Sequence, residues 1–229
     1  IEFQILADHY GNVIHLGERE CSIQRHHQKL IEETPSPVIS PRMREEFGER
    51  LVQAIQKIGY RNAGTVEFLM ENEKNLYFME MNKRIQVEHP ITEMVTGIDI
   101  VEEQIRIAAN HRLRLSQKDV KFHGHAIECR INAEDPEHGF QPCPGKITKF
   151  APPLIQDAGI TLRLDTFVEE GYVIPPFYDS MIAKLIIHAP TRATAIQAMI
   201  RALQNFSIAG IKTTIPLHLQ ILNSQAFQS

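Results

Sequence analysis

The alternation of apolar and polar positions predicts a pair of strands at the start of the chain. Residues 2–7 alternate Phe3 and Ile5 with polar neighbours, a turn follows at 8–12, and residues 13–16 return as a second strand. The run that follows, 18–29, is almost entirely polar. Two interpretations are open for it: a solvated charged segment, or a segment whose many hydrogen-bond donors serve a purpose beyond an ordinary loop.

Helical spacing of apolar residues appears twice in the first half of the chain. Ser40 and Pro41 have the form of a helix start, and Gly59 ends the apolar pattern that follows them. A second helix is predicted to begin at the cap Asp99. Its expected apolar stripe comprises Val101, Ile105 and Ala108.

Two further strands, residues 65–70 and 76–81, are joined by a polar connection of hairpin length. If the loop comprises residues 72–75, then Glu71 pairs with Leu76 and Glu67 lies directly opposite Glu80. Facing carboxylates repel each other, and a divalent cation reverses the sign of that interaction.

The same hairpin predicts a metal site. In strict alternation Glu80 and Asn82 share a strand face with Leu76 and Phe78, so a carboxylate replaces a core side chain. Oxygen ligands without a cluster of His or Cys favour Mg²⁺ or Mn²⁺ over zinc. We therefore expect Glu67, Glu80 and Asn82 to surround a cation, with a solvent-facing sheet surface as the alternative.

The segment after Asn82 is dense in polar side chains, namely Arg84, Gln86, Glu88 and His89. Arg84 can bind two oxygens of a planar anion at once. Glu88, close to that anion, can serve as a general base. A network of surface ion pairs is the alternative interpretation.

The pattern turns to strands again from Lys121. Arg130 projects from a strand at 125–132, where it is either a functional arginine or an ordinary paired surface arginine. A further helix is predicted to begin near Thr191. We expect two domains, residues 1–116 and 117–229.

Composition argues against two classes of partner. The 229 residues carry a formal net charge of −4, which lacks the basic excess that nucleic-acid binding requires. No apolar run approaches the roughly 18 residues of a membrane span. The three cysteines are odd in number and far apart, which favours a reducing, cytoplasmic location, or an organelle after removal of a targeting segment.

Several segments together resemble the biotin carboxylases, the ATP-dependent component of the biotin-dependent carboxylases. In chain order they are 24–29 (QRHHQK), 64–68 (GTVEF), 80–90 (EMNKRIQVEHP), 128–134 (ECRINAE) and 178–181 (YDSM). The stretch from Arg84 to His89 is similar to biotin carboxylases in particular, because carbamoyl phosphate synthetases carry a serine-rich stretch after the arginine.

The resemblance implies an α+β fold: the latter part of an ATP-grasp domain, an antiparallel sheet with helices, followed by the biotin carboxylase C-terminal α+β domain. It implies carboxylation of biotin on a biotin carboxyl carrier protein. Bicarbonate attacks the γ-phosphate of ATP to form carboxyphosphate, which yields CO₂ and phosphate, and the phosphate helps deprotonate biotin before N-carboxylation. It further implies a carboxyltransferase component, as in acetyl-CoA carboxylase of fatty acid biosynthesis, and a homodimer.

The resemblance also implies the role of each matching residue. Glu67 and Glu80 would hold the Mg²⁺ or Mn²⁺ ions at the ATP phosphates, with Asn82 beside them. Bicarbonate would be bound by Lys29, Arg84, Gln86 and the backbone of Val87. Glu88 would deprotonate bicarbonate, Arg84 would also stabilise developing charge, and Arg130 would face the enolate-like oxygen of biotin. Gln24 and His27 would lie by the nucleotide ribose.

Some features of the family are missing from the sequence. The family's N-terminal domain, glycine-rich lid, ATP-binding lysines and adenine hinge would precede Ile1, so we expect a fragment that is inactive alone. Cys143 and Thr214 stand where serine and asparagine are usual, and we expect neither to touch a catalytic role. The alternative functions are a non-catalytic dimerisation module that keeps the fold and another ATP-grasp ligase.

Overall fold

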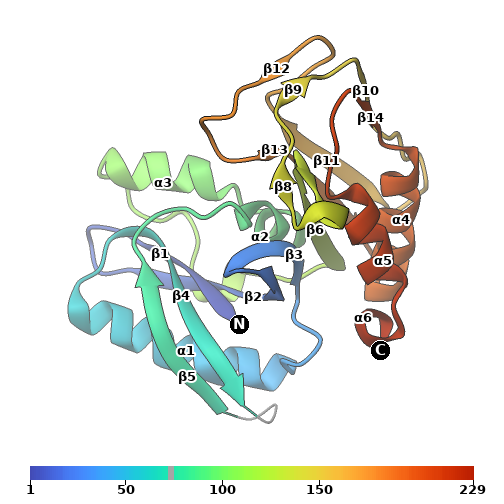
Figure 1. Ribbon diagram of the computed structural model, residues 1–229. Helices are drawn as coiled ribbons and strands as arrows, with labels where there is room; N and C mark the ends of the chain where they lie inside the picture. The colour runs from blue at the N-terminus through green and yellow to red at the C-terminus, as the bar shows by residue number, and fades with distance from the viewer. Residues whose placement is uncertain (72–74) are drawn as a thin grey trace. The chain divides into compact units, whose positions relative to one another are not determined.

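The computed structural model describes residues 1–71 and 75–229 (Figure 1). The chain forms two compact units, residues 1–22 with 32–126 and residues 23–31 with 127–229. Both units combine helices with antiparallel strand pairs. The α+β class predicted from the sequence is confirmed.

The first unit contains an antiparallel sheet with β2, β1, β4 and β5 in that order. A 3-10 helix at Gln117–Asp119 follows the last α-helix of this unit. The strands and helices are β1 (Glu2–Ala7), β2 (Val13–Arg25), β3 (Gln28–Thr34), α1 (Pro41–Ile58), β4 (Asn62–Glu71), β5 (Asn75–Asn82), α2 (His89–Thr96) and α3 (Ile100–Ala108). Residues 23–31 of β2 and β3 belong to the second unit.

The second unit packs its helices and strands around a single large apolar cluster. Strands β11, β13 and β6 are neighbours in that order. Its elements are β6 (His125–Asn132), β7 (Glu134–Asp135), a 3-10 helix (Pro136–His138), β8 (Gln141–Pro142), β9 (Gly145–Lys146), β10 (Lys149–Ala151), β11 (Thr161–Thr166), β12 (Val173–Ile174), β13 (Met181–Ala189), α4 (Arg192–Asn205), β14 (Ser207–Ala209), α5 (Ile215–Asn223) and α6 (Gln225–Gln228).

Helix α1 begins and ends as its sequence predicts. The Ser40 side chain accepts a hydrogen bond from the Met43 amide at 3.2 Å, and Pro41 occupies the first helical position. Gly59 closes the helix in the left-handed conformation, with φ of 64°. The helix covers one face of β4 and β5, where Ile55 packs with Val66 in a small apolar cluster.

Strand β2 is longer than predicted. We expected it to end at residue 16, but it continues to Arg25, and Glu18 and Arg19 are fully buried. Arg44 of α1 explains the burial of Glu18, because its guanidinium donates to both carboxylate oxygens at 2.6 and 2.7 Å. The interpretation of this segment as solvated is therefore wrong up to Cys21.

The predicted stripe of α3 is also wrong. Asp99 caps the helix as expected, yet Val101 and Ile105 are largely exposed while Ile100 and Ile107 are buried. Glu103 lies between the two buried isoleucines in the helical pattern and is itself buried, because its carboxylate pairs with Arg114 and Arg106. A carboxylate within the apolar face concealed the true stripe.

Helix α2 was not predicted. Pro90, the last residue of the motif 80–90, occupies the first turn of this helix. A proline is tolerated there, because the first amides of a helix have no partner within the helix.

Among the described residues, no helix is both long enough and apolar enough to cross a membrane.

His15 is a buried histidine of the first unit and is held neutral. Its Nδ1 accepts a hydrogen bond from the Gly17 amide at 3.3 Å, so the ring proton belongs on Nε2. Burial, reinforced by the nearby Arg44 charge, lowers the pKa of His15 from 6.5 to about 4.

We expect this histidine to make the fold acid-sensitive. Because the unfolded chain takes up a proton near pH 6.5 and the folded chain only near pH 4, stability is complete above pH 6.5 and is lost as pH falls toward 4. The loss between pH 7 and pH 5 is about 2 kcal/mol. The free energy of unfolding, measured with urea across this pH range, should depend less on pH in His15→Gln than in the wild type. The control is His111→Gln, a change of an exposed histidine. If the unfolding free energy of His15→Gln varied with pH as steeply as that of the wild type, the assignment of acid sensitivity to His15 would be contradicted.

Candidate active site

The β4–β5 hairpin brings Glu67 and Glu80 opposite each other, as predicted. The ladder near the turn is shifted from the prediction, because Glu71 pairs with Asn75 instead of Leu76. The predicted loop residues 72–74 lie outside the described part of the chain. A bulge at Met79, between the Glu67–Glu80 pair and the Phe68–Phe78 pair, compensates for the shift.

The bulge also changes which residues share a face. Phe78 packs edge-on against Phe68, and together with Met81 it lines the apolar groove beside α1. Our prediction that Phe78 shares a face with Glu80 is therefore wrong, because one extra residue reverses the alternation. Glu80 is exposed and does not replace a core side chain.

Three side chains of this hairpin form one hydrogen-bonded cluster. The amide nitrogen of Asn82 donates to Glu67 Oε1 and to Glu80 Oε1, both at 3.1 Å. An electropositive NH₂ group thus lies between two carboxylates. The arrangement brings oxygens of two carboxylates to one point, and carboxylate oxygens are ligands that Mg²⁺ and Mn²⁺ prefer.

Gln86 joins this cluster from the segment after β5. Its Nε2 donates to Glu67 Oε1 at 2.8 Å, and its side chain is buried. Among the described residues, Gln86 Oε1 has no hydrogen-bond partner although it is buried. A buried acceptor of this kind suits a ligand that donates a hydrogen bond. Nearby in sequence, Arg84 is exposed, with Nη1 donating to the Ile85 carbonyl at 3.2 Å.

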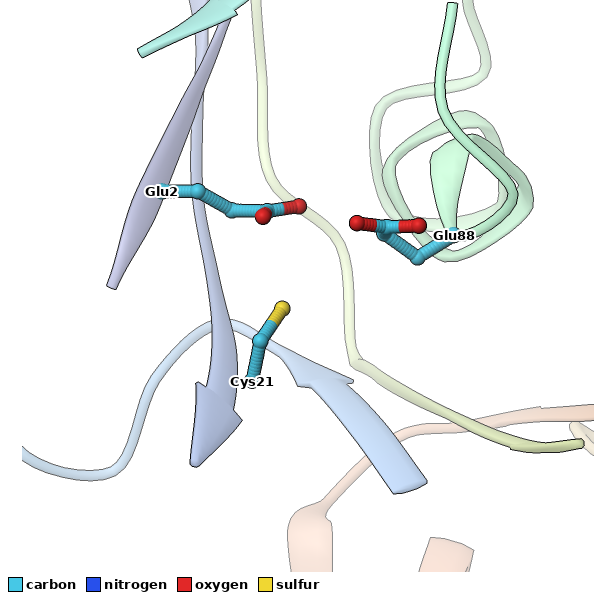
Figure 2. Close-up of side chains that lie close together, drawn as sticks. All are labelled: Glu2, Cys21 and Glu88. Atoms are coloured by element: carbon cyan, nitrogen blue, oxygen red, sulfur yellow. The ribbon is translucent and has the colours of Figure 1, made fainter. Parts of the chain in front are cut away.

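Glu88 is buried, with 2% of its surface exposed, and within the described chain its side chain makes no capping bond at the start of α2. It faces the carboxylate of Glu2 on β1 and the thiol of Cys21 on β2 instead (Figure 2). One ligand atom from each residue lies within 4.8 Å of the others. Two carboxylates in one buried pocket repel each other when both are ionised.

Sequence reasoning missed Glu2, Cys21 and Arg19 as neighbours of Glu88. Arg19 donates from Nε to Glu2 at 2.6 Å, and it is fully buried. Burial alone would lower the pKa of Arg19, but the negative groups around it, Glu2 and Glu88 first among them, raise it. The only available signal was Glu2 and Gln4 alternating with apolar residues, which normally indicates a solvent-facing side.

Three of the predicted residues, Gln24, His27 and Lys29, belong to the second unit. Gln24 and Lys29 flank the two-residue turn between β2 and β3, and His27 lies in it; His26 and His27 both have positive φ, 47° and 63°. Two left-handed residues in a two-residue loop match the twist of the adjoining strands. Gln24 and His27 are exposed, and Lys29 is partly buried.

Arg130 lies in the second unit, on β6, with its side chain partly buried. Arg25, at the end of β2, is anchored in the same unit: its guanidinium lies 4.0 Å above the Phe140 ring and 3.5 Å from Glu134. Val87 is partly buried between Gln86 and Glu88 in the first unit. The first unit thus gathers the predicted metal and base residues, while the nucleotide and biotin residues belong to the second.

Comparison with known families gives two matches in chain order. Residues 1–116 match the carbamoyl-phosphate synthase L chain, ATP binding domain, and residues 128–229 match the biotin carboxylase C-terminal domain.

Individual relatives agree along the whole chain. A biotin carboxylase of Nostoc sp. is 58% identical over 99% of this chain and 50% of the relative. Biotin carboxylase 1 of Bacillus subtilis is 55% identical over 100% of the chain and 50% of the relative. The chain therefore spans about half the length of the relatives it matches.

A solved structure provides an independent comparison. The biotin carboxylase domain dimer of Hydrogenobacter thermophilus 2-oxoglutarate carboxylase, in complex with MgADP, ADP and bicarbonate, superimposes with a TM-score of 0.94 at 54% identity. The match covers 99% of this chain and 49% of that chain. The two family matches, the identity along the whole chain and the shared structure lead to one conclusion. The chain belongs to the biotin carboxylase family.

Proposed function

We propose that this chain takes part in the ATP- and bicarbonate-dependent carboxylation of biotin carried by a biotin carboxyl carrier protein. The observation that carries the proposal is the sequence of groups at the end of β5. The carboxylates of Glu67 and Glu80, linked by the Asn82 side-chain amide, are followed within six residues by the buried carboxylate Glu88. A metal-binding set beside a buried base suits phosphoryl transfer to a weakly acidic nucleophile.

The metal residues of the proposal are Glu67 and Glu80, with Asn82 beside them. Their fit is supported by the Asn82 NH₂ group, which lies between the two carboxylates where a cation would be favoured. Mg²⁺ or Mn²⁺ bound there would neutralise charge on the phosphates of ATP. We propose that Gln24 and His27 contact the ribose of the same nucleotide.

Bicarbonate is the proposed ligand of Lys29, Arg84, Gln86 and the Val87 backbone. The buried Gln86 Oε1 supports this role, because it can accept a hydrogen bond from the bicarbonate hydroxyl. Glu88 then removes that proton, so that the oxygen attacks the γ-phosphate of ATP, which forms carboxyphosphate and releases ADP. Arg84 offsets the charge that develops on the oxygens.

Biotin is the proposed acceptor of the CO₂ released from carboxyphosphate. Phosphate takes the proton from the ureido nitrogen of biotin, and the Arg130 guanidinium stabilises the negative charge on the ureido oxygen. We further propose a homodimer that works with a carboxyltransferase component inside the cell. The ATP-grasp role falls to residues 1–116 and the C-terminal domain role to residues 117–229.

The base assignment predicts a large loss of rate for one isosteric change. Glu88→Gln should lower bicarbonate-dependent ATP cleavage at least about 100-fold, because the amide cannot accept the proton. Phosphate release from the enzyme at its full natural length measures the effect. The control is Glu93→Gln on the same helix, whose side-chain oxygen can still accept from the Ile100 amide. A rate for Glu88→Gln equal to that of the control would refute the base assignment.

The metal assignment predicts a change in metal dependence. Glu80→Gln should raise the Mg²⁺ concentration for half-maximal ATP cleavage about tenfold, because a charged ligand is lost. Direct Mn²⁺ titration should show the same weakening of binding. Glu71→Gln, an exposed change on β4 whose partner is the Tyr77 hydroxyl, is the control. Equal Mn²⁺ affinity in both variants would show that Glu80 is not a ligand.

A further inference from the structure

The start of α5 contacts the backbone of β6 at Arg130. The Thr214 hydroxyl donates to the Arg130 carbonyl at 3.0 Å, and His218 Nε2 lies 2.7 Å from the same oxygen. Both side chains are completely buried. Both lone pairs of one carbonyl oxygen are thus used by side chains from a single helix.

The bonding state of both groups follows from their partners. A carbonyl only accepts, so His218 must carry its proton on Nε2. Its Nδ1 has no hydrogen-bond partner among the described residues, and burial lowers the pKa of His218 to about 4, so the ring is neutral. The Thr214 hydroxyl accepts from the Asn132 amide at 3.0 Å while it donates to Arg130. It therefore bridges the two ends of the segment 130–132.

Thr214 makes this bridge instead of capping its own helix. It occupies the N-cap of α5, where a threonine hydroxyl normally accepts from an amide of the first turn, yet the described part of the chain contains no such bond. Pro216 in that turn has no amide to satisfy, which lowers the cost of diverting the hydroxyl. The Thr214 amide adds a third contact by donating to the Asn132 carbonyl at 3.1 Å.

We propose that Thr214 and His218 are positioning residues for Arg130. They fix the peptide planes on either side of residue 131 and so the direction in which the Arg130 side chain leaves the strand. This inference rests on the proposed role of Arg130 at the ureido oxygen of biotin. We expected that the threonine at position 214, where asparagine is usual, touches no catalytic role. The inference differs from that expectation, because the Thr214 hydroxyl bonds the backbone carbonyl of Arg130.

The test separates the biotin step from the earlier steps. In the enzyme at its full natural length, Thr214→Val should raise the KM for free biotin about tenfold, since a small displacement of a catalytic group is costly. The KM values for ATP and bicarbonate should stay within about twofold, because Arg130 contacts neither in the proposed mechanism. His218→Leu should behave in the same way.

Conservative variants provide rescue. Thr214→Asn should retain the biotin KM, because its amide can donate to Arg130 and accept from Asn132. His218→Gln should do so as well, by donating to the Arg130 carbonyl. If Thr214→Val does not fold, the biotin KM of His218→Leu compared with that of His218→Gln tests the positioning role instead.

A matched control is present in the same unit. The Thr166 hydroxyl donates to the Ile182 carbonyl at 2.8 Å and accepts from the Val168 amide at 3.2 Å, so it also bonds one carbonyl and one amide, neither of them in the segment 130–132. Thr166→Val removes an equivalent bridge and should leave the biotin KM unchanged. An equal rise in biotin KM for Thr166→Val would indicate a merely structural effect and overturn the inference.

Arg130→Ala distinguishes failure of the inference from failure of the proposed function. If Arg130→Ala impairs the biotin step but Thr214→Val and His218→Leu do not, the positioning role alone is wrong. If Arg130→Ala has no effect, the role of Arg130 and the inference are both wrong. Absence of bicarbonate-dependent ATP cleavage in the wild type overturns the proposed function itself.

Discussion

The buried guanidinium of Arg19 joins four elements of the first unit. From β2 it donates to Glu2 and Gln4 on β1, to Thr65 on β4 and to Thr92 on α2, at distances from 2.6 to 3.2 Å. A buried arginine costs several kcal/mol unless it is paired and its donors are satisfied, and here each of its three nitrogens is bonded. The requirement to satisfy this one group aligns β1 with β4 and holds α2 against them.

The same requirement places the proposed base. Thr92 lies one helical turn after Glu88, so the bond from Arg19 to Thr92 holds the start of α2 close to Glu2. The positive charge of Arg19 interacts with both Glu2 and Glu88 and offsets the repulsion between the two carboxylates. Because Thr65 is on β4 two residues before Glu67, the network also supports the strand that carries a proposed metal ligand.

The two units use different devices to orient functional side chains. In the first, a single bulged residue, Met79, keeps Glu80 opposite Glu67 and leaves Phe78 against the apolar side of the hairpin. In the second, side chains of α5 bond the backbone of β6 at Arg130. Bulges such as the one at Met79 are common where a side chain must be re-aimed.

The sequence alone determined the features that depend on local chemistry. The α1 boundaries follow from a serine, a proline and a glycine. The sequence also predicted the pairing of Glu67 with Glu80, although from a turn register that differs from the one in the structure. The family resemblance was likewise readable, because its motifs are contiguous stretches of the chain. Capping groups and strand periods act over a few residues, so their signals survive without knowledge of the fold.

Tertiary structure decided what depends on distant partners. Glu18, Arg19 and Glu103 are polar residues that looked exposed and are buried, because each finds its counter-charge on another segment. The bulge at Met79 and the bridge from Thr214 to Arg130 have no local signature, since each depends on how two segments meet. A buried polar group is stable only with its partners in place, and those partners are fixed by the fold, not by the neighbouring sequence.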